Sequence, residues 1–198
     1  MELYDFALTM GVTPLVIGKG KNNPLNYSSN PDTAAEAAAR HQMNPRMLAS
    51  FQDGTKTMVE LTAMANATGF LPDVPGARGP PPAAEELRGL SRLREEGGIL
   101  SRYATVDYVN GVAPGVFAIV TTPHPELRAQ LRYLSMGEGP NYLLYRPYHL
   151  CSMETPISIA RAALRGMATI APLAEAPFAE TGGGAKGDTR GRGGPAGS

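Results

Sequence analysis

Apolar side chains recur at the spacing of an α-helix along residues 44–69. A helix here would begin at Asn44, carry Pro45 in its first turn and end at Gly69. Gly54 interrupts the pattern, because glycine costs about 1 kcal/mol relative to alanine inside a helix. The sequence therefore predicts a helix with a break or a close approach at Gly54. Its apolar arc would be formed by Met47, Leu48, Phe51, Met58, Leu61 and Ala65.

The remaining pattern alternates between helix and strand. A short apolar run at 15–17 follows a short amphipathic helix and a glycine, which is one half of a doubly wound α/β unit. We expect an α/β (α+β) fold, in which this strand is followed by an open mixed sheet with helices on one face. The expected helices cover 2–10, 31–41, 83–96, 125–134 and 154–165, and the later strands cover 104–109, 116–122 and 142–146.

Composition narrows the classes of function. The chain has 198 residues and is 42% hydrophobic, which suits a globular core. Lys+Arg and Asp+Glu both number 18, so net charge indicates neither nucleic acid nor an anionic membrane as a partner. We see no signal peptide and no apolar run near the roughly 20 residues that span a bilayer. Cys151 is the sole cysteine, which excludes an internal disulfide and favours a reducing, cytoplasmic location.

Charged side chains gather on the opposite arc of the 44–69 helix. Asp53, Lys56 and Glu60 follow one another at steps of three and four residues. They could form an exposed ladder of ion pairs, which is common and weak. They could instead hold a lysine between two carboxylates at the mouth of a cleft, where the lysine donates a proton or binds an anionic substrate. The helix alone leaves both interpretations open.

A segment rich in glycine and lysine, GKGKNNP at 18–24, directly follows the apolar run. Ligands of open α/β sheets bind at the carboxyl ends of strands, so a loop at this position is well placed for binding. Lys19, Lys21, Asn22 and Asn23 would supply its hydrogen-bond donors. The spacing fits neither a P-loop nor a dinucleotide fingerprint. An ordinary basic turn is the competing interpretation.

An arginine and a histidine follow the last expected strand. Arg146 and His149, with two tyrosines nearby, suit the recognition of an anion or a hydroxyl group. A structural histidine with satisfied hydrogen bonds is the alternative. Cys151 lies close by in a largely apolar stretch, which predicts a buried and unreactive thiol rather than a nucleophile.

Several segments together resemble a known family. The most specific are DGTKTMVE at 53–60 and YRPYHL at 145–150. Over about residues 1–177 the chain resembles the catalytic region of the homoserine-dehydrogenase-like NAD(P)-dependent oxidoreductases. It is more closely similar to the subgroup related to the deoxyxylulose phosphate reductoisomerase-like (DRL-like) enzyme, whose members carry a SAF domain. The other segments that carry the resemblance are GKGKNNPLN, ANATG, VDYVNGVAPGVFAIVTT, MGEGPNYLLYRPYHL and ETPISIA.

The resemblance implies three parts: a Rossmann domain, a central catalytic and dimerisation region, and a SAF-like domain. Residues 1–18 would then be the C-terminal remnant of a Rossmann NAD(P)-binding domain, and 19–177 the catalytic and dimerisation domain. Residues 178–198 are rich in glycine and nearly free of apolar side chains, which predicts a disordered tail. The dinucleotide fingerprint and the SAF region are missing from the sequence, so we expect a fragment of a longer gene.

The resemblance also implies roles for the candidate residues. Lys56 becomes the candidate donor of a proton to a carbonyl oxygen that is reduced by hydride. Asp53 and Glu60 would tune this lysine or hold a divalent metal. Arg146 and His149 would close the substrate pocket, with His149 counted among the catalytic residues.

The segment at 18–24 would lie beside the nicotinamide and the substrate. Lys19 and Lys21 would bind a substrate phosphate, and Asn22 and Asn23 would orient the substrate. The predicted function is hydride transfer between NADP(H) or NAD(H) and a small, phosphorylated hydroxyl or carbonyl compound. We expect a homo-oligomer, a dimer, that binds neither nucleic acid nor membrane.

Other functions also fit the sequence. The chain could be a non-catalytic module for oligomerisation or ligand sensing, or an inactive gene fragment. It could also be a true homoserine dehydrogenase. The basic segment at 18–24 favours a phosphorylated substrate over a zwitterionic amino acid, which ranks that enzyme lower.

Overall fold

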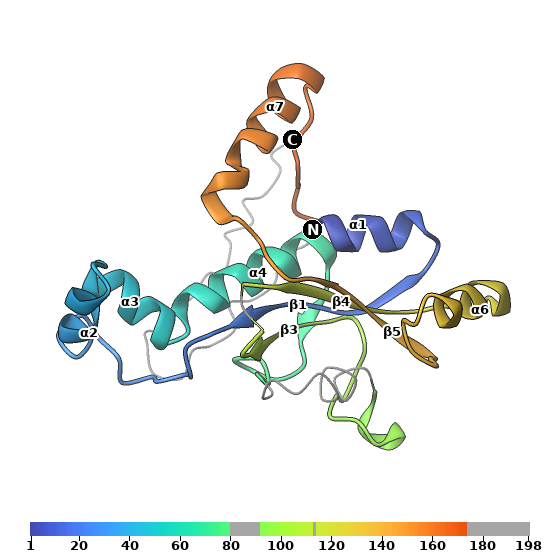
Figure 1. Cartoon of the computed structure of the whole chain (residues 1–198), viewed down its shortest axis with the longest axis horizontal. Helices are drawn as coiled ribbons and strands as arrows, with labels where there is room; N and C mark the ends of the chain where they lie inside the picture. The colour runs from blue at the N-terminus through green and yellow to red at the C-terminus, as the bar shows by residue number, and fades with distance from the viewer. Residues whose placement is uncertain (80–91, 113, 174–198) are drawn as a thin grey trace, which may run out of the picture.

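A mixed β-sheet forms the centre of the fold. The computed structural model describes residues 1–79, 92–112 and 114–173 (Figure 1). In the described part the sheet has five strands, in the order β2-β3-β1-β4-β5. Strand β3 is parallel to both β1 and β2, whereas β4 is antiparallel to β1 and β5. The strands are β1 (Thr13–Lys21), β2 (Leu71–Pro72), β3 (Thr105–Asn110), β4 (Val116–Thr121) and β5 (Asn141–Arg146).

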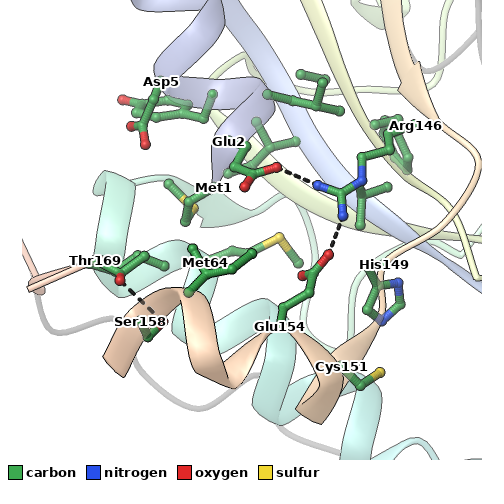
Figure 2. A pocket seen from close by; sticks show the side chains of 18 of the residues that line it. Met1, Glu2, Asp5, Met64, Arg146, His149, Cys151, Glu154, Ser158 and Thr169 are labelled. Atoms are coloured by element: carbon green, nitrogen blue, oxygen red, sulfur yellow. Dashed lines mark hydrogen bonds and ion pairs between the residues drawn. The ribbon is translucent and has the colours of Figure 1, made fainter. Parts of the chain in front are cut away.

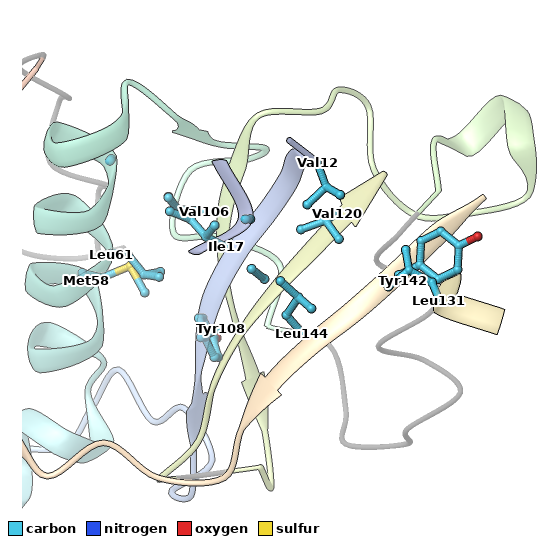
Figure 3. Packing of buried hydrophobic residues seen from close by; sticks show 13 residues of the cluster. Val12, Ile17, Met58, Leu61, Val106, Tyr108, Val120, Leu131, Tyr142 and Leu144 are labelled. Carbon is cyan, nitrogen blue, oxygen red and sulfur yellow. The ribbon is translucent and has the colours of Figure 1, made fainter. Parts of the chain in front are cut away.

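The helices of the described part that pack on the sheet cover one of its faces. Side chains from α1, α4 and α6 meet the sheet in a cluster that includes Leu61, Ile17, Val120 and Leu144 (Figure 3). The opposite face packs on residues 93–103, which include the short 3-10 helix η1 (Arg94–Glu96). The expected α/β fold with an open mixed sheet is confirmed. The α-helices are α1 (Glu2–Thr9), α2 (Ala35–Arg40), α3 (Pro45–Gln52), α4 (Thr55–Thr68), α6 (Pro125–Tyr133) and α7 (Thr155–Arg165).

The 44–69 segment forms two helices because the chain turns sharply at Gly54. This residue has a φ of 92°, which only glycine adopts without strain, and it separates α3 from α4. It also permits a close approach, because a Cβ atom here would lie 2.7 Å from Cδ1 of Leu25. Both alternatives predicted for Gly54 are therefore confirmed. The turn leaves Met47 exposed, whereas Leu61 is buried.

Strand β1 is longer than the sequence pattern predicted. The loop expected at 18–24 is wrong for residues 18–21, which continue β1. The reason is pairing on both sides, since Lys21 pairs with Asn110 of β3 and Lys19 pairs with Val116 of β4. The predicted domain boundary between residues 18 and 19 falls inside this strand, and the division into domains stays a prediction.

The remaining predictions differ in outcome. The strands β3, β4 and β5 and the helix α6 begin and end within one residue of their expected bounds. Helix α7 forms as expected and ends at Gly166, but it is exposed along its length and projects from the sheet (Figure 1). Most of the helix expected at 83–96, and the tail expected at 178–198, lie outside the described residues. No helix in the described ranges has the length and apolar character needed to cross a membrane.

Candidate active site

The register of the sheet places two cations in one row on its helix-covered face. Lys19 of β1 pairs with Val116 of β4, and Val116 pairs in turn with Arg146 of β5. Ile17 and Leu144 lie two positions earlier on β1 and β5 and belong to the cluster under α4, so Lys19 and Arg146 point to that same face. Two strand spacings separate their backbones, about 10 Å.

Lys19 contacts a carboxylate that it shares with a second lysine. Its Nζ atom forms an ion pair with Oε2 of Glu60, and Nζ of Lys56 lies 3.8 Å from Oε1 of the same side chain. Lys56 also lies over the ring of Phe51, 4.5 Å from its centroid. One of the two interpretations of the sequence was a lysine held between two carboxylates. The structure corrects this, because it has a carboxylate between two lysines and the second lysine comes from β1.

Burial sets the charge state of Lys19. The residue is 8% exposed, and burial lowers the pKa of its amine to about 8. The positive charges of Lys56 and Lys21 lower the pKa further, whereas Cys151 acts in the opposite direction. Near neutral pH this amine therefore exchanges a proton more readily than an ordinary lysine.

The neighbouring residues of the basic segment have different surroundings. Lys21 is buried, and its amine donates a hydrogen bond to the carbonyl of Phe51 at the end of α3. Burial lowers the pKa of Lys21, and the charge of Asp53 opposes this effect. Asn22 is exposed and Asn23 is partly buried, and neither belongs to the ion pairs of the described residues.

Asp53 does not join Lys56 and Glu60 in an ion-pair ladder. Its Oδ1 atom accepts a hydrogen bond of 2.7 Å from the backbone nitrogen of Thr55, at the start of α4. This bond satisfies one of the free N–H groups of the first helical turn. The contact gives Asp53 a structural role at the junction of α3 and α4.

A cavity of about 350 Å³ lies beside the row of cations (Figure 2). Ile17, Val116 and Met64 contribute apolar surface to it, and residues of α1, η2 (Cys151–Glu154) and α7 complete its walls. Cys151 lies on this wall and is exposed, so the prediction of a buried thiol was wrong. The reason is that η2 buries none of its residues.

Arg146 crosses this cavity between two acidic side chains. Its two terminal nitrogens form ion pairs with Glu2 of α1 and with Glu154 of η2 (Figure 2). Although burial alone would lower the pKa of Arg146, these carboxylates raise it above its usual value. The guanidinium also lies 4.7 Å from the ring centroid of Tyr148. Sequence patterns gave no indication of Glu2, because it is 144 residues from Arg146 along the chain.

His149 also lines the cavity, as predicted from its position after β5. Its Nδ1 atom contacts the carbonyl oxygen of Pro114, which fixes the ring beside the cavity. The predicted residues therefore form two groups. Lys19, Lys56 and Glu60 meet near the end of β1, whereas Arg146 and His149 both line the cavity at and after the end of β5.

Asp107 of β3 is the charged residue with the most complete burial in the described part of the chain. It is fully buried, and its carboxylate accepts hydrogen bonds from the backbone nitrogens of Arg78, Gly79 and Tyr108. Burial raises the pKa of Asp107 to about 6, although these bonds oppose the shift. The contacts tie the segment after β2 to β3 and lie apart from both groups of site residues.

The described residues contain no cluster of three or more His, Cys, Asp or Glu side chains that could hold a metal ion. Asp53 and Glu60, which the resemblance suggested as metal ligands, and the acidic residues Asp107 and Glu154 bind separate partners. These are Asp53 on Thr55, Glu60 on Lys19, Asp107 on Arg78 and Glu154 on Arg146. They therefore do not converge.

A dinucleotide cofactor can be tested against the same residues. Its pyrophosphate usually lies on a glycine-rich turn between a strand and the N-terminus of a helix. In the described ranges, β1 leads into the irregular segment before α2. Strand β4 reaches α6 through Thr122, Pro123 and His124, without a glycine. These residues do not fit a pyrophosphate.

The fold and the site define an α/β enzyme domain, with buried ionisable groups beside a cavity at the ends of the central strands. Residues 1–155 match the model of the family described as "Oxidoreductase DRL, catalytic domain". The chain belongs to this family and contains an oxidoreductase catalytic domain. No curated protein gave a match to the sequence. The match confirms the DRL part of the resemblance, whereas the SAF domain and the homoserine-dehydrogenase-like grouping stay predictions.

Proposed function

We propose that this domain transfers hydride between NADP(H) or NAD(H) and a small hydroxyl or carbonyl compound, in which its own residues handle the proton. The observation that carries this proposal is the group formed by Lys19, Glu60 and Lys56, which adjoins the cavity-lining residues Ile17 and Gly18 of β1, in a chain of an oxidoreductase family. Reduction of a carbonyl adds hydride at carbon and a proton at oxygen. A lysine whose pKa lies near 8 can donate that proton near neutral pH.

The substrate that we propose is small and acidic, and a phosphate is the acidic group that suits the lysines best. A cavity of about 350 Å³ is at the small end of ligand pockets. Lys21 lies on β1 beside this group, so three lysines face the carboxylates of Glu60 and Asp53 in this region. The excess positive charge favours a substrate with a negative group. The dimer implied by the family resemblance belongs to the same proposal.

The experiment uses the purified chain with NADPH or NADH and a panel of three- to five-carbon aldehydes and ketones. Each compound is supplied with and without a terminal phosphate, and cofactor absorbance reports turnover. We expect oxidation of the cofactor with phosphorylated members of the panel. Glu60→Gln should lower this turnover about 100-fold, because the shared carboxylate positions both lysines.

Glu36→Gln is the matched control, because Glu36 forms an exposed ion pair with Arg40 away from the site. It should leave turnover unchanged. If panel members bind but cofactor is never consumed, the proposal fails and the ligand-sensing alternative gains. If Glu60→Gln retains full turnover, the group at the end of β1 does not carry the chemistry.

A further inference from the structure

A second cavity opens on the face of the sheet opposite to α4. Leu15 and Tyr103 line it, and both pack in the apolar cluster on that face. Its volume is about 450 Å³, which is within the range of ligand pockets. It lies where β4 ends at Thr121 and β5 begins at Asn141, whereas Arg146 lies at the other end of β5, roughly 17 Å along the strand. The two cavities are therefore separate, and the proposed function involves only the one beside Arg146.

Three side chains on the wall of this second cavity are joined by hydrogen bonds, although they are far apart in the sequence. The hydroxyl of Tyr103 donates a hydrogen bond of 2.7 Å to Oε2 of Glu96. The side chain of Asn141 forms a hydrogen bond with Tyr103 as well. Burial, and then the bond to Glu96, raises the pKa of Tyr103, so the phenol keeps its proton and remains a donor. The series holds the carboxylate of Glu96 in one position beside the cavity.

Glu96 keeps one carboxylate oxygen available for a ligand. Its Oε2 atom accepts the bond from Tyr103 and a second bond, of 3.3 Å, from the backbone nitrogen of Leu93. Within the described ranges, Oε1 takes part in no hydrogen bond or ion pair. A carboxylate that is fixed through one oxygen and free at the other is suited to bind an ammonium group.

Arg92 brings a charge of the opposite sign to the same cavity. Its side chain forms no hydrogen bond or ion pair with any residue that the structure describes, Glu96 included. A guanidinium presents parallel N–H groups that bind both oxygens of a carboxylate. The cavity therefore offers an unpaired cation and a held anion to one ligand.

We propose that this cavity binds a small α-amino acid as a zwitterion, with its carboxylate on Arg92 and its ammonium group on Glu96. Leu15 and Pro140 add apolar surface to the wall, which favours an aliphatic side chain on the ligand. The hydroxyl of Thr121 already donates to the carbonyl oxygen of Pro140, so the two charges dominate recognition. A simple anion would leave Glu96 beside a like charge, and a simple amine would leave Arg92 without a partner. The inference does not depend on the proposed function.

The first experiment tests the zwitterion by isothermal titration calorimetry on the full chain. Leucine is compared with isocaproate, which lacks its amine, and with isoamylamine, which lacks its carboxylate; valine and alanine complete the panel. We expect saturable binding of at least one of these amino acids, and binding of each leucine analogue that is about 10-fold weaker or more, because each analogue leaves one charge of the site unpaired. Absence of saturable binding by all three amino acids would overturn the proposal. Equal binding of leucine and isocaproate would overturn the role of Glu96.

The second experiment tests the assigned residues with the amino acid that binds best. Arg92→Met and Glu96→Gln should each weaken its binding about 10-fold or more, because each removes the partner of one ligand charge. Tyr103→Phe should weaken it less, because the charge of Glu96 remains and only the bond that positions it is lost. Arg40→Met and Glu36→Gln are the matched controls, since these residues form an exposed ion pair on α2, and they should leave binding unchanged.

The analogue sharpens the assignment of Glu96. Glu96→Gln should not weaken the binding of isocaproate, because isocaproate has no ammonium group for the carboxylate to bind. Circular dichroism checks that every variant is folded, which is expected because Arg92 and Glu96 are exposed. Amino acid binding that is unchanged in both Arg92→Met and Glu96→Gln would place the ligand elsewhere and overturn the site.

Discussion

Lys19 and Arg146 occupy the same row of the sheet, yet their surroundings give their charges different properties. Lys19 lies on the central strand β1 under α4, where burial lowers its pKa to about 8. Arg146 lies on the edge strand β5 between Glu2 and Glu154, and a guanidinium stays charged throughout the range in which proteins fold. The comparison shows that burial on a central strand can bring the pKa of an amine close to neutral pH. The guanidinium on the edge strand, in contrast, keeps its charge.

The largest expected effect compares the burial of two helices, α4 and α7. Leu61 of α4 is 1% exposed and Leu164 of α7 is 84% exposed. Leu61→Ala should lower the free energy of unfolding by about 2–5 kcal/mol, because it leaves a cavity in the core over β1. Leu164→Ala should change it by less than about 0.5 kcal/mol. Urea denaturation of both variants measures the difference. A large loss in Leu164→Ala would show that α7 is covered in solution.

The second effect is the dependence of stability on pH. The pKa of Lys19 is lower in the folded chain, about 8, than the value of about 10.4 expected after unfolding. Between these values the unfolded chain binds more protons, so stability rises with pH there, by at most about 1.4 kcal/mol per pH unit. Lys19→Met should reduce this rise when unfolding is measured at pH 8, 9 and 10, and Lys21, whose pKa burial also lowers, should keep part of it.

Arg146→Met is the control for this second effect. Arg146 keeps its charge over the same range, so the variant should retain the rise in stability between pH 8 and 10. A rise of undiminished size in Lys19→Met would assign it to another group. A rise lost in both variants would mean that the titration of Lys19 depends on the fixed charge of Arg146.

The smallest effects concern the carboxylates that hold Arg146. Glu154 is more buried than Glu2, with side-chain exposures of 33% and 69%. Glu154→Gln should lower the free energy of unfolding by about 1 kcal/mol and Glu2→Gln by less than about 0.5 kcal/mol. Both losses should shrink in 1 M salt, because the Debye length falls to about 3 Å. Equal losses that are insensitive to salt would contradict this view of the edge strand.

Local patterns were enough to predict much of the fold. Gly54 predicted the turn between α3 and α4. Pro125 predicted the start of α6, and Gly166 predicted the end of α7. The length of β1 was not visible, because it depends on pairing with β3 and β4 rather than on the residues of 18–21 themselves. Alternating glycine and lysine residues are typical of a loop when the sequence is considered locally. Here they form a strand because β3 and β4 pair with them on both sides.

The sequence indicated several residues of the site one by one, but it did not indicate which of them contact one another. Lys19, Lys56 and Glu60 were all candidates, yet the ion pair between Lys19 and Glu60 joins residues 41 positions apart. The burial of Asp107 depends on the backbone of residues 78–79, which strand alternation does not describe. Side-chain periodicity predicts which side chains of a helix or strand lie on the same face. Which distant residue each of them contacts depends on how the elements pack on the sheet.

Gly18 has a consequence for redesign of the cavity. A Cβ atom at this position would lie 2.1 Å from the backbone oxygen of Asp107 and 2.5 Å from the ring of Phe117, so β1 tolerates no larger residue here. Val116, across the row, also lines the cavity and is only partly buried. An engineer who wishes to alter substrate size should therefore leave β1 intact and vary Val116, with alanine to admit bulkier compounds and leucine to reject them.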